Sequence, residues 1–125
     1  MSDPDALVRE FCGAWSKKDA DLLAGYFAED GVYHNIPMQP LEGREAIRGF
    51  LAGFLSAVET VEFQIRHQVA TGNVVMNERV DVFRTTAGKE GGFRVAGVFE
   101  IRGGKIAAWR DYFDMAPVTA FLSGA

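Results

Sequence analysis

The apolar residues of this chain change their spacing once, near its middle. In the first half they recur at helical intervals, as with Leu7, Phe11 and Trp15, which fall four residues apart on one stripe. In the second half, apolar and polar residues alternate in segments rich in Val, Ile and Phe. Helices followed by a run of strands favour an α+β fold, with N-terminal helices packed on one face of a strongly curved, mostly antiparallel sheet.

The first half is expected to hold three helices and a short strand. Asp3 and Pro4 are suited to the N-cap and first turn of a helix that continues to about residue 15. Asp19 is suited to cap a second helix, whose apolar stripe extends to Phe27. A short strand is expected over residues 32–36, and a third helix over residues 43–57.

The second half is expected to form four strands, over residues 61–69, 74–84, 93–102 and 105–113. Gly72-Asn73 and Gly103-Gly104 lie at hairpin positions, and residues 86–92 form a longer connection. A curved sheet covered by helices on one side makes a cone, and the mouth of such a cone is a natural internal pocket.

Length and charge exclude several functional classes. The 125 residues predict a single domain over residues 1–125. A net charge of −4 without a basic run argues against nucleic acid as a partner. The most apolar stretch, residues 50–58, is too short to cross a membrane. With a single cysteine and no secretory signal at the N-terminus, a cytoplasmic location is expected.

Polar residues share strand faces with large aromatic residues. Alternation places three groups on common faces: Asn77, Arg79, Asp81 and Phe83; Trp109, Asp111 and Phe113; Tyr33 and Asn35. A single Arg–Asp pair on a strand is most often a solvated surface pair. The occurrence of polar residues beside aromatic residues on three strands together instead favours a buried site, in which an arginine between two carboxylates would supply the partner that each charge needs.

The same segments resemble the limonene-1,2-epoxide hydrolase family. The resemblance is carried by Tyr33-x-Asn35, by Asn77-Glu78-Arg79-Val80-Asp81-Val82 and by Trp109-Arg110-Asp111-Tyr112-Phe113-Asp114. It covers about residues 7–115, including Pro37, Gly43-Arg44 and Gly97-Val98-Phe99. That family has the cone-shaped fold shared with nuclear transport factor 2 and ketosteroid isomerase.

The resemblance implies one-step hydrolysis of an epoxide to a vicinal diol, with no covalent intermediate and no cofactor. It implies Asp111 as the general base, with Tyr33 and Asn35 helping to hold the attacking water. It implies Asp81 as the general acid, and Arg79 as the bridge between the two acids.

An apolar pocket wall is expected beside these residues, formed by Phe54, Val58, Phe83, Phe93, Val95 and Phe113. Such a wall suits a hydrophobic epoxide such as a terpene, cyclic alkene or aryl oxide. With two histidines, one cysteine and no ligand-spaced cluster, no metal site is expected. Cys12 lies on the apolar stripe of the first helix and is expected in the core.

The same residues are compatible with two alternative functions, and the outer face of the sheet predicts a dimer. A polyketide cyclase or ketosteroid isomerase-like enzyme would share the fold, and so would a non-catalytic module that binds a small ligand. Arg79 disfavours isomerase chemistry, because a neighbouring guanidinium stabilises the ionised form of an acid. The far face of the sheet carries Val74, Met76, Val80, Val82 and Val98, which predicts a symmetric homodimer that covers it.

Overall fold

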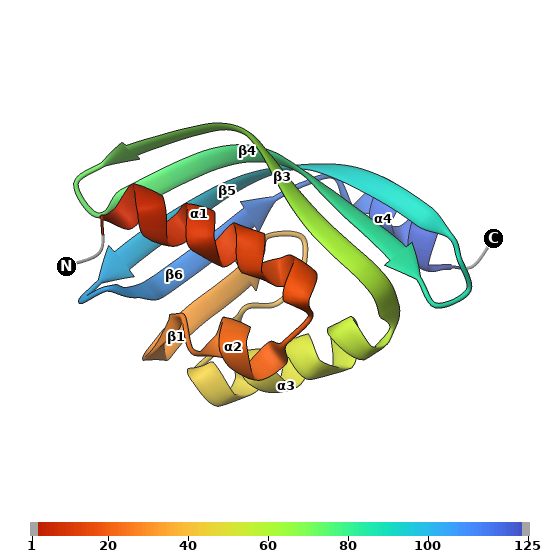
Figure 1. Ribbon diagram of the computed structural model, residues 1–125, viewed down its shortest axis with the longest axis horizontal. Coiled ribbons are helices and arrows are strands. Elements are labelled where there is room, and N and C mark those ends of the chain that lie inside the picture. The colour runs from red at the N-terminus through yellow and green to blue at the C-terminus, as the bar shows by residue number, and fades with distance from the viewer. Residues whose placement is uncertain (1–2, 124–125) are drawn as a thin grey trace.

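The computed structural model describes residues 3–123 and is built on one six-stranded sheet with its helices arranged around it (Figure 1). The helices are α1 (Pro4–Ala14), α2 (Ala20–Ala24), α3 (Arg44–Ser56) and α4 (Met115–Leu122), with a 3-10 turn at Trp15–Lys17. The strands are β1 (Phe27–Asn35), β2 (Leu41–Glu42), β3 (Val58–Thr71), β4 (Val74–Thr85), β5 (Glu90–Arg102) and β6 (Lys105–Tyr112).

The strands follow the order β2-β1-β6-β5-β4-β3. Every neighbouring pair is antiparallel except β1 and β6, which run parallel. The β3–β4 and β5–β6 hairpins turn at Gly72 and Gly103, each with a φ of 57°, which is a backbone conformation that glycine adopts without strain. The expected α+β class and mostly antiparallel, curved sheet are confirmed.

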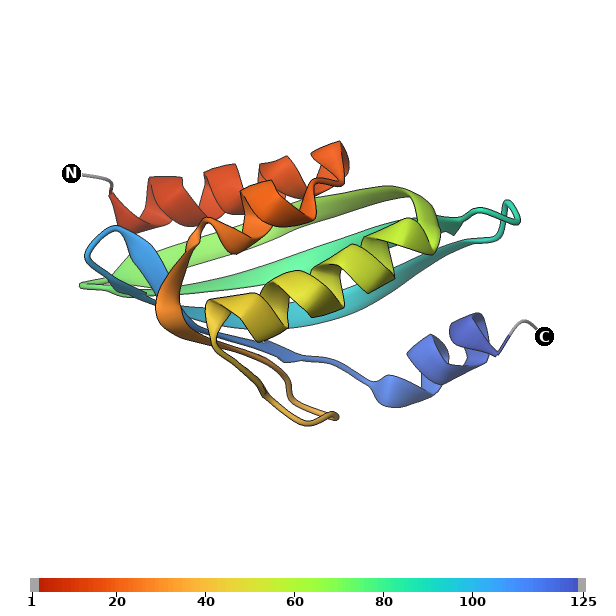
Figure 2. The same ribbon diagram turned by 90° about the horizontal axis from the view of Figure 1, so that it is seen from below.

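The core lies between the N-terminal helices and one face of the sheet, as the view from below shows (Figure 2). Helix α1 buries Leu7, Val8, Phe11 and Cys12 toward β3 and β4. The Phe11 ring meets the Trp109 ring of β6 edge to face, with 5.0 Å between centroids. This packing fixes the inward face of the sheet, on which the polar residues also lie.

Several expected boundaries were wrong. Helix α2 ends at Ala24, and Phe27 begins β1, because Tyr26 and Phe27 follow Gly25 out of the helix and into the sheet. Val58 was expected on the helix that covers the pocket but begins β3. Phe113 lies just beyond the end of β6. Helix α4 was not expected, since its sequence MAPVTAFL has no polar face to mark a helical stripe.

Helix α4 lies beside the hairpin that joins β4 to β5, at the end of the molecule opposite the N-terminus (Figures 1 and 2). Asp114 caps it by accepting a hydrogen bond from the Ala116 amide at 3.1 Å. Among residues 3–123, no helix has the length and apolar character needed to span a membrane.

Candidate active site

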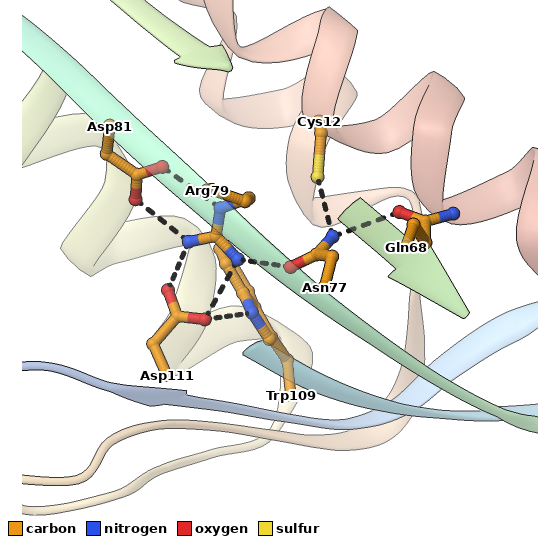
Figure 3. Close-up of polar contacts among 7 residues, drawn as sticks. All are labelled: Cys12, Gln68, Asn77, Arg79, Asp81, Trp109 and Asp111. Atoms are coloured by element: carbon orange, nitrogen blue, oxygen red, sulfur yellow. Dashed lines mark hydrogen bonds and ion pairs between the residues drawn. The ribbon is translucent and has the colours of Figure 1, made fainter. Parts of the chain in front are cut away.

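Arg79 lies at the centre of a buried polar cluster on the inward face of the sheet (Figure 3). Its side chain is fully buried, and a guanidinium has five N–H donors. Nε and Nη2 donate to the two Asp81 carboxyl oxygens at 2.9 and 2.8 Å. Nη1 and Nη2 donate to the two Asp111 oxygens at 3.2 and 2.8 Å, and Nη1 also donates to Asn77 Oδ1 at 3.1 Å. All five donors therefore have an acceptor.

The two carboxyl groups meet on one nitrogen. Asp81 Oδ2 and Asp111 Oδ2 each lie 2.8 Å from Arg79 Nη2. Both carboxyl side chains are almost completely buried. Two buried carboxylates and one guanidinium carry a net charge of −1, and the cluster becomes neutral when one carboxyl holds a proton.

The two carboxyl oxygens of Asp111 accept different numbers of hydrogen bonds. Oδ1 accepts from Arg79 and also from Trp109 Nε1 at 2.7 Å. Among the described residues, Oδ2 accepts from Arg79 alone. A carboxylate oxygen offers about two acceptor sites, so Oδ2 keeps one site, and Asp111 lines a cavity.

The strand register brings the expected water-holding residues to Asp111. Asn35 of β1 is the register partner of Asp111, and Tyr33 is the partner of Trp109. The Tyr33 and Trp109 rings stack with 4.2 Å between centroids and 6° between planes. Tyr33, Asn35, Asp81 and Asp111 all line one cavity.

Burial governs the titration of two of these groups. It raises the pKa of Asp81 from 3.8 to about 6, against the opposing effect of Arg79, and the charge of Asp111 raises it further. Burial, followed by the charge of Asp111, raises the pKa of Tyr33, which keeps the phenol neutral. Burial would lower the pKa of Arg79, but the charges and hydrogen bonds of Asp111 and Asp81 raise it overall.

Gly97 makes room for the guanidinium. It is the register partner of Asn77 on one side and of Asp111 on the other. A Cβ at this position would lie 2.5 Å from Arg79 Nη1 and 2.8 Å from Asp111 Oδ1. Gly97 was not among the expected site residues, although a glycine on a strand between two polar strands is a signal for close approach.

Asn77 links the cluster to the surface. Its Nδ2 donates to Gln68 Oε1 at 3.0 Å and, more weakly, to Cys12 Sγ at 3.9 Å. Gln68 Nε2 in turn donates to Asp5 Oδ1 at 2.8 Å. This chain fixes the Asn77 amide with its oxygen toward Arg79, since the Nδ2 side is occupied by acceptors.

The cavity has a volume of about 230 Å³ and an apolar wall. Of the expected wall residues, Phe54, Phe83, Phe93, Val95 and Phe113 line it. Val58 does not; it packs in the core at the start of β3. Eight residues that were not expected complete the wall: Trp15, Met38, Phe50, Phe63, Met115, Val118, Phe121 and Leu122. The last four lie on α4, and these were not expected because the helix itself was not expected.

Comparisons with known proteins identify the family of this chain. The model of the SnoaL-like domain family matches residues 8–109. The chain belongs to the SnoaL-like domain family. It is 32% identical over 108 residues to the epoxide hydrolase EphG of Mycobacterium tuberculosis, covering 86% of this chain and 71% of that protein. The resemblance to epoxide hydrolases stated from the sequence motifs is thereby confirmed.

Solved structures extend the comparison of this SnoaL-like chain. An LEH-like epoxide hydrolase from M. tuberculosis matches with a TM-score of 0.83 and 29% identity, over 97% of this chain and 90% of that one. A SnoaL-like polyketide cyclase from Shewanella putrefaciens matches with a TM-score of 0.85 over 100% and 99% of the two chains. At 16% identity, the latter likeness shows the fold alone.

Proposed function

We propose that this protein adds water to a small hydrophobic epoxide, giving a vicinal diol in one step without a covalent intermediate. One observation carries the proposal: a single buried guanidinium bridges two buried carboxyl groups that both line an apolar cavity. Epoxide opening needs a base for water and an acid for the ring oxygen, and this cluster is neutral in the state that offers one of each. The similarity to epoxide hydrolase EphG supports the same reaction.

Asp111 is the proposed base. Three hydrogen bonds from Arg79 and Trp109 fix its carboxylate, and the remaining acceptor site on Oδ2 takes the proton of water. Tyr33 and Asn35 are proposed to hold that water, since both line the cavity beside Asp111. As the proton moves to Oδ2, the water oxygen forms a bond to one epoxide carbon.

Asp81 is the proposed acid. The carbon–oxygen bond of the ring breaks as Asp81 gives its proton to the epoxide oxygen, which avoids a free alkoxide. Its raised pKa keeps a population of protonated Asp81 in weakly acidic solution. The diol gains the elements of one water, and the two acids finish with their protonation states exchanged. Proton transfer through water then restores them, so we propose that no cofactor takes part.

The deciding experiment measures diol formed from a panel of epoxides (limonene oxide, cyclohexene oxide and phenyloxirane) by chiral gas chromatography. We expect wild-type protein to form diol and the Asp111→Asn variant to lose about 10²–10⁴-fold in rate, the usual contribution of a general base. Asp21→Asn is the matched control, because it makes the same change at an exposed carboxyl group on α2. Equal, background-level diol in wild type and Asp111→Asn would overturn the proposal and favour a cyclase or a non-catalytic binding module.

We also propose a homodimer that forms through the outer face of the sheet. Met76 is 50% exposed and Tyr112 is 45% exposed on this face. Val80, Val82 and Val98 are half-buried beside them. Contiguous exposed apolar residues of this kind mark interaction surfaces, and a second copy of the chain would cover them.

A further inference from the structure

Five phenylalanine rings surround the apolar part of the cavity in one continuous series of contacts. Successive ring centroids along the series lie 6.2, 5.3, 6.0 and 5.3 Å apart. The rings come from α3, β4, β5 and α4, and in order they are Phe50, Phe54, Phe83, Phe93 and Phe121. Residues from four elements therefore place aromatic rings around one small space.

The same rings surround the proposed acid. Asp81 has Phe63 of β3 and Phe93 of β5 as its register partners, and Phe83 lies two residues along on the same face. All three rings line the cavity with Asp81. An epoxide oxygen held at Asp81 would thus place the substituents of its ring among phenyl groups.

We infer that the substrate is an aryl-substituted epoxide with one aromatic ring attached to an epoxide carbon; this inference rests on the proposed hydrolase function. Aromatic rings attract one another edge to face and in offset stacks, through their quadrupoles, beyond the burial of area that a saturated ring of equal size provides. One such pair corresponds to about a two- to tenfold preference in binding. A cavity of about 230 Å³ is below the range of about 300–1,000 Å³ that is usual for ligand sites, which favours a single ring.

The aromatic wall also favours cleavage of the bond between the epoxide oxygen and the benzylic carbon. When Asp81 protonates the epoxide oxygen, the bond from that oxygen to the benzylic carbon breaks with its electron pair on oxygen. The positive charge that develops on the benzylic carbon is spread over the substrate ring, and the faces of the surrounding rings stabilise it. Water deprotonated by Asp111 forms its new bond to this carbon, so the inference includes attack at the benzylic position.

The test compares two epoxides that differ only in aromaticity. Phenyloxirane and cyclohexyloxirane have the same carbon skeleton and the same number of non-hydrogen atoms. We expect kcat/KM to be at least about tenfold higher for phenyloxirane, after subtraction of the rate with Asp111→Asn. Equal values, or a preference for cyclohexyloxirane, would overturn the aryl class and leave the hydrolase intact. Diol from limonene oxide or cyclohexene oxide, but none from phenyloxirane above the Asp111→Asn rate, would likewise overturn the aryl class. No diol from any of these epoxides above that rate would overturn the hydrolase itself.

Variants of the phenylalanines that line the cavity test whether their rings cause the preference for phenyloxirane. Phe83→Leu and Phe93→Leu keep an apolar side chain but remove the ring, so the ratio of the two kcat/KM values should fall about two- to tenfold for each ring removed. The part of the ratio that comes from the substrate's own ring should remain. The ratio does not depend on the fraction of protein that is folded, because both substrates meet the same enzyme. Tyr26→Leu is the matched control, since it removes a ring that lies outside the cavity and should leave the ratio unchanged. An unchanged ratio in both phenylalanine variants would overturn the role of these rings.

The site of attack has a separate measurement. In water enriched in oxygen-18, the phenyloxirane diol should carry the label on its benzylic carbon, which mass spectrometry of the fragments locates. Label on the terminal carbon would show that the aromatic wall does not direct the opening, and would overturn that part of the inference.

Discussion

Arg79 occupies the space that a side chain at position 97 would need. The Cβ of any other residue there would lie 2.5 Å from Nη1, well inside van der Waals contact. The guanidinium is held from the other sides by Asp81, Asp111 and Asn77. The glycine and the arginine are therefore one structural unit, although they lie on different strands.

Gly97→Ala should disable the site. The methyl group would displace the guanidinium and with it both carboxyl groups, and a displacement of about 1 Å in a catalytic group costs about 100-fold in rate. We expect a loss of that size in kcat/KM for any epoxide that the wild type hydrolyses. Gly92→Ala on the same strand is the control, because its Cβ would make ordinary contacts at 3.5 Å. Wild-type kinetics in Gly97→Ala would show that the position of Arg79 does not matter.

Activity should fall in alkaline solution because of Asp81. The proposed acid must hold its proton, and its pKa is raised from 3.8 to about 6, chiefly by burial. As pH rises through that value, kcat/KM should decrease, approaching about tenfold per pH unit. A pH profile of kcat/KM from pH 4 to pH 9 measures this decrease. A profile that rises through pH 6 would assign the acid role elsewhere.

The same group should make stability depend on pH. The folded protein binds the Asp81 proton more tightly than the unfolded chain does, because the folded pKa lies above 3.8. Its contribution to the free energy of unfolding is thus full below pH 3.8 and is lost as pH rises through about 6. In Asp81→Asn this contribution disappears, so urea denaturation between pH 4 and pH 7 should show a weaker decline than in wild type.

Asn77→Ala should destabilise the protein as well as slow it. The change removes the only acceptor of one Arg79 N–H among the described residues, and an unpaired buried donor costs about 1–3 kcal/mol. Gln68→Ala should cost less, since Gln68 acts through Asn77 and is itself half-buried. Urea denaturation compares the two variants. A larger loss of unfolding free energy in Gln68→Ala than in Asn77→Ala would contradict the conclusion that Gln68 acts through Asn77.

The proposed dimer has a direct measurement. Light scattering coupled to size exclusion should give twice the 13.7 kDa of one chain. Met76→Lys places a charge at a residue that is 50% exposed on the outer face, and should give a monomer with unchanged secondary structure. A monomeric wild type at high concentration would contradict the proposal.

Strand alternation was enough to predict the central cluster because its geometry follows the period of the sheet. Arg79 and Asp81 are two residues apart on β4, and Asp111 reaches Arg79 across β5. Alternation specifies a face but says nothing of the space available on it. For that reason alternation alone did not reveal the need for Gly97 beside the guanidinium.

Helix α4 could not be predicted from periodicity. Its residues are apolar on all sides, so it lacks the polar and apolar stripes that mark an amphipathic helix. None of its residues is fully buried, and its contacts with the sheet are to β5. It contributes Met115, Val118, Phe121 and Leu122 to the cavity wall, so the size of the site depends on an element that strand patterns do not describe.

Gly91 leaves room for the Phe121 ring of α4. A Cβ at Gly91 would lie 2.7 Å from Phe121 Cδ1, whereas the rings of Phe93 and Phe121 meet edge to face at 5.3 Å. Gly91→Ala should displace this ring and raise KM about three- to tenfold, while kcat and the free energy of unfolding stay close to wild type, because α4 buries no residue. Adding Phe121→Ala to Gly91→Ala should raise KM little further, since both changes remove the same contact. Additive effects in this double-mutant cycle, or a loss in kcat alone, would show that Gly91 does not act through Phe121.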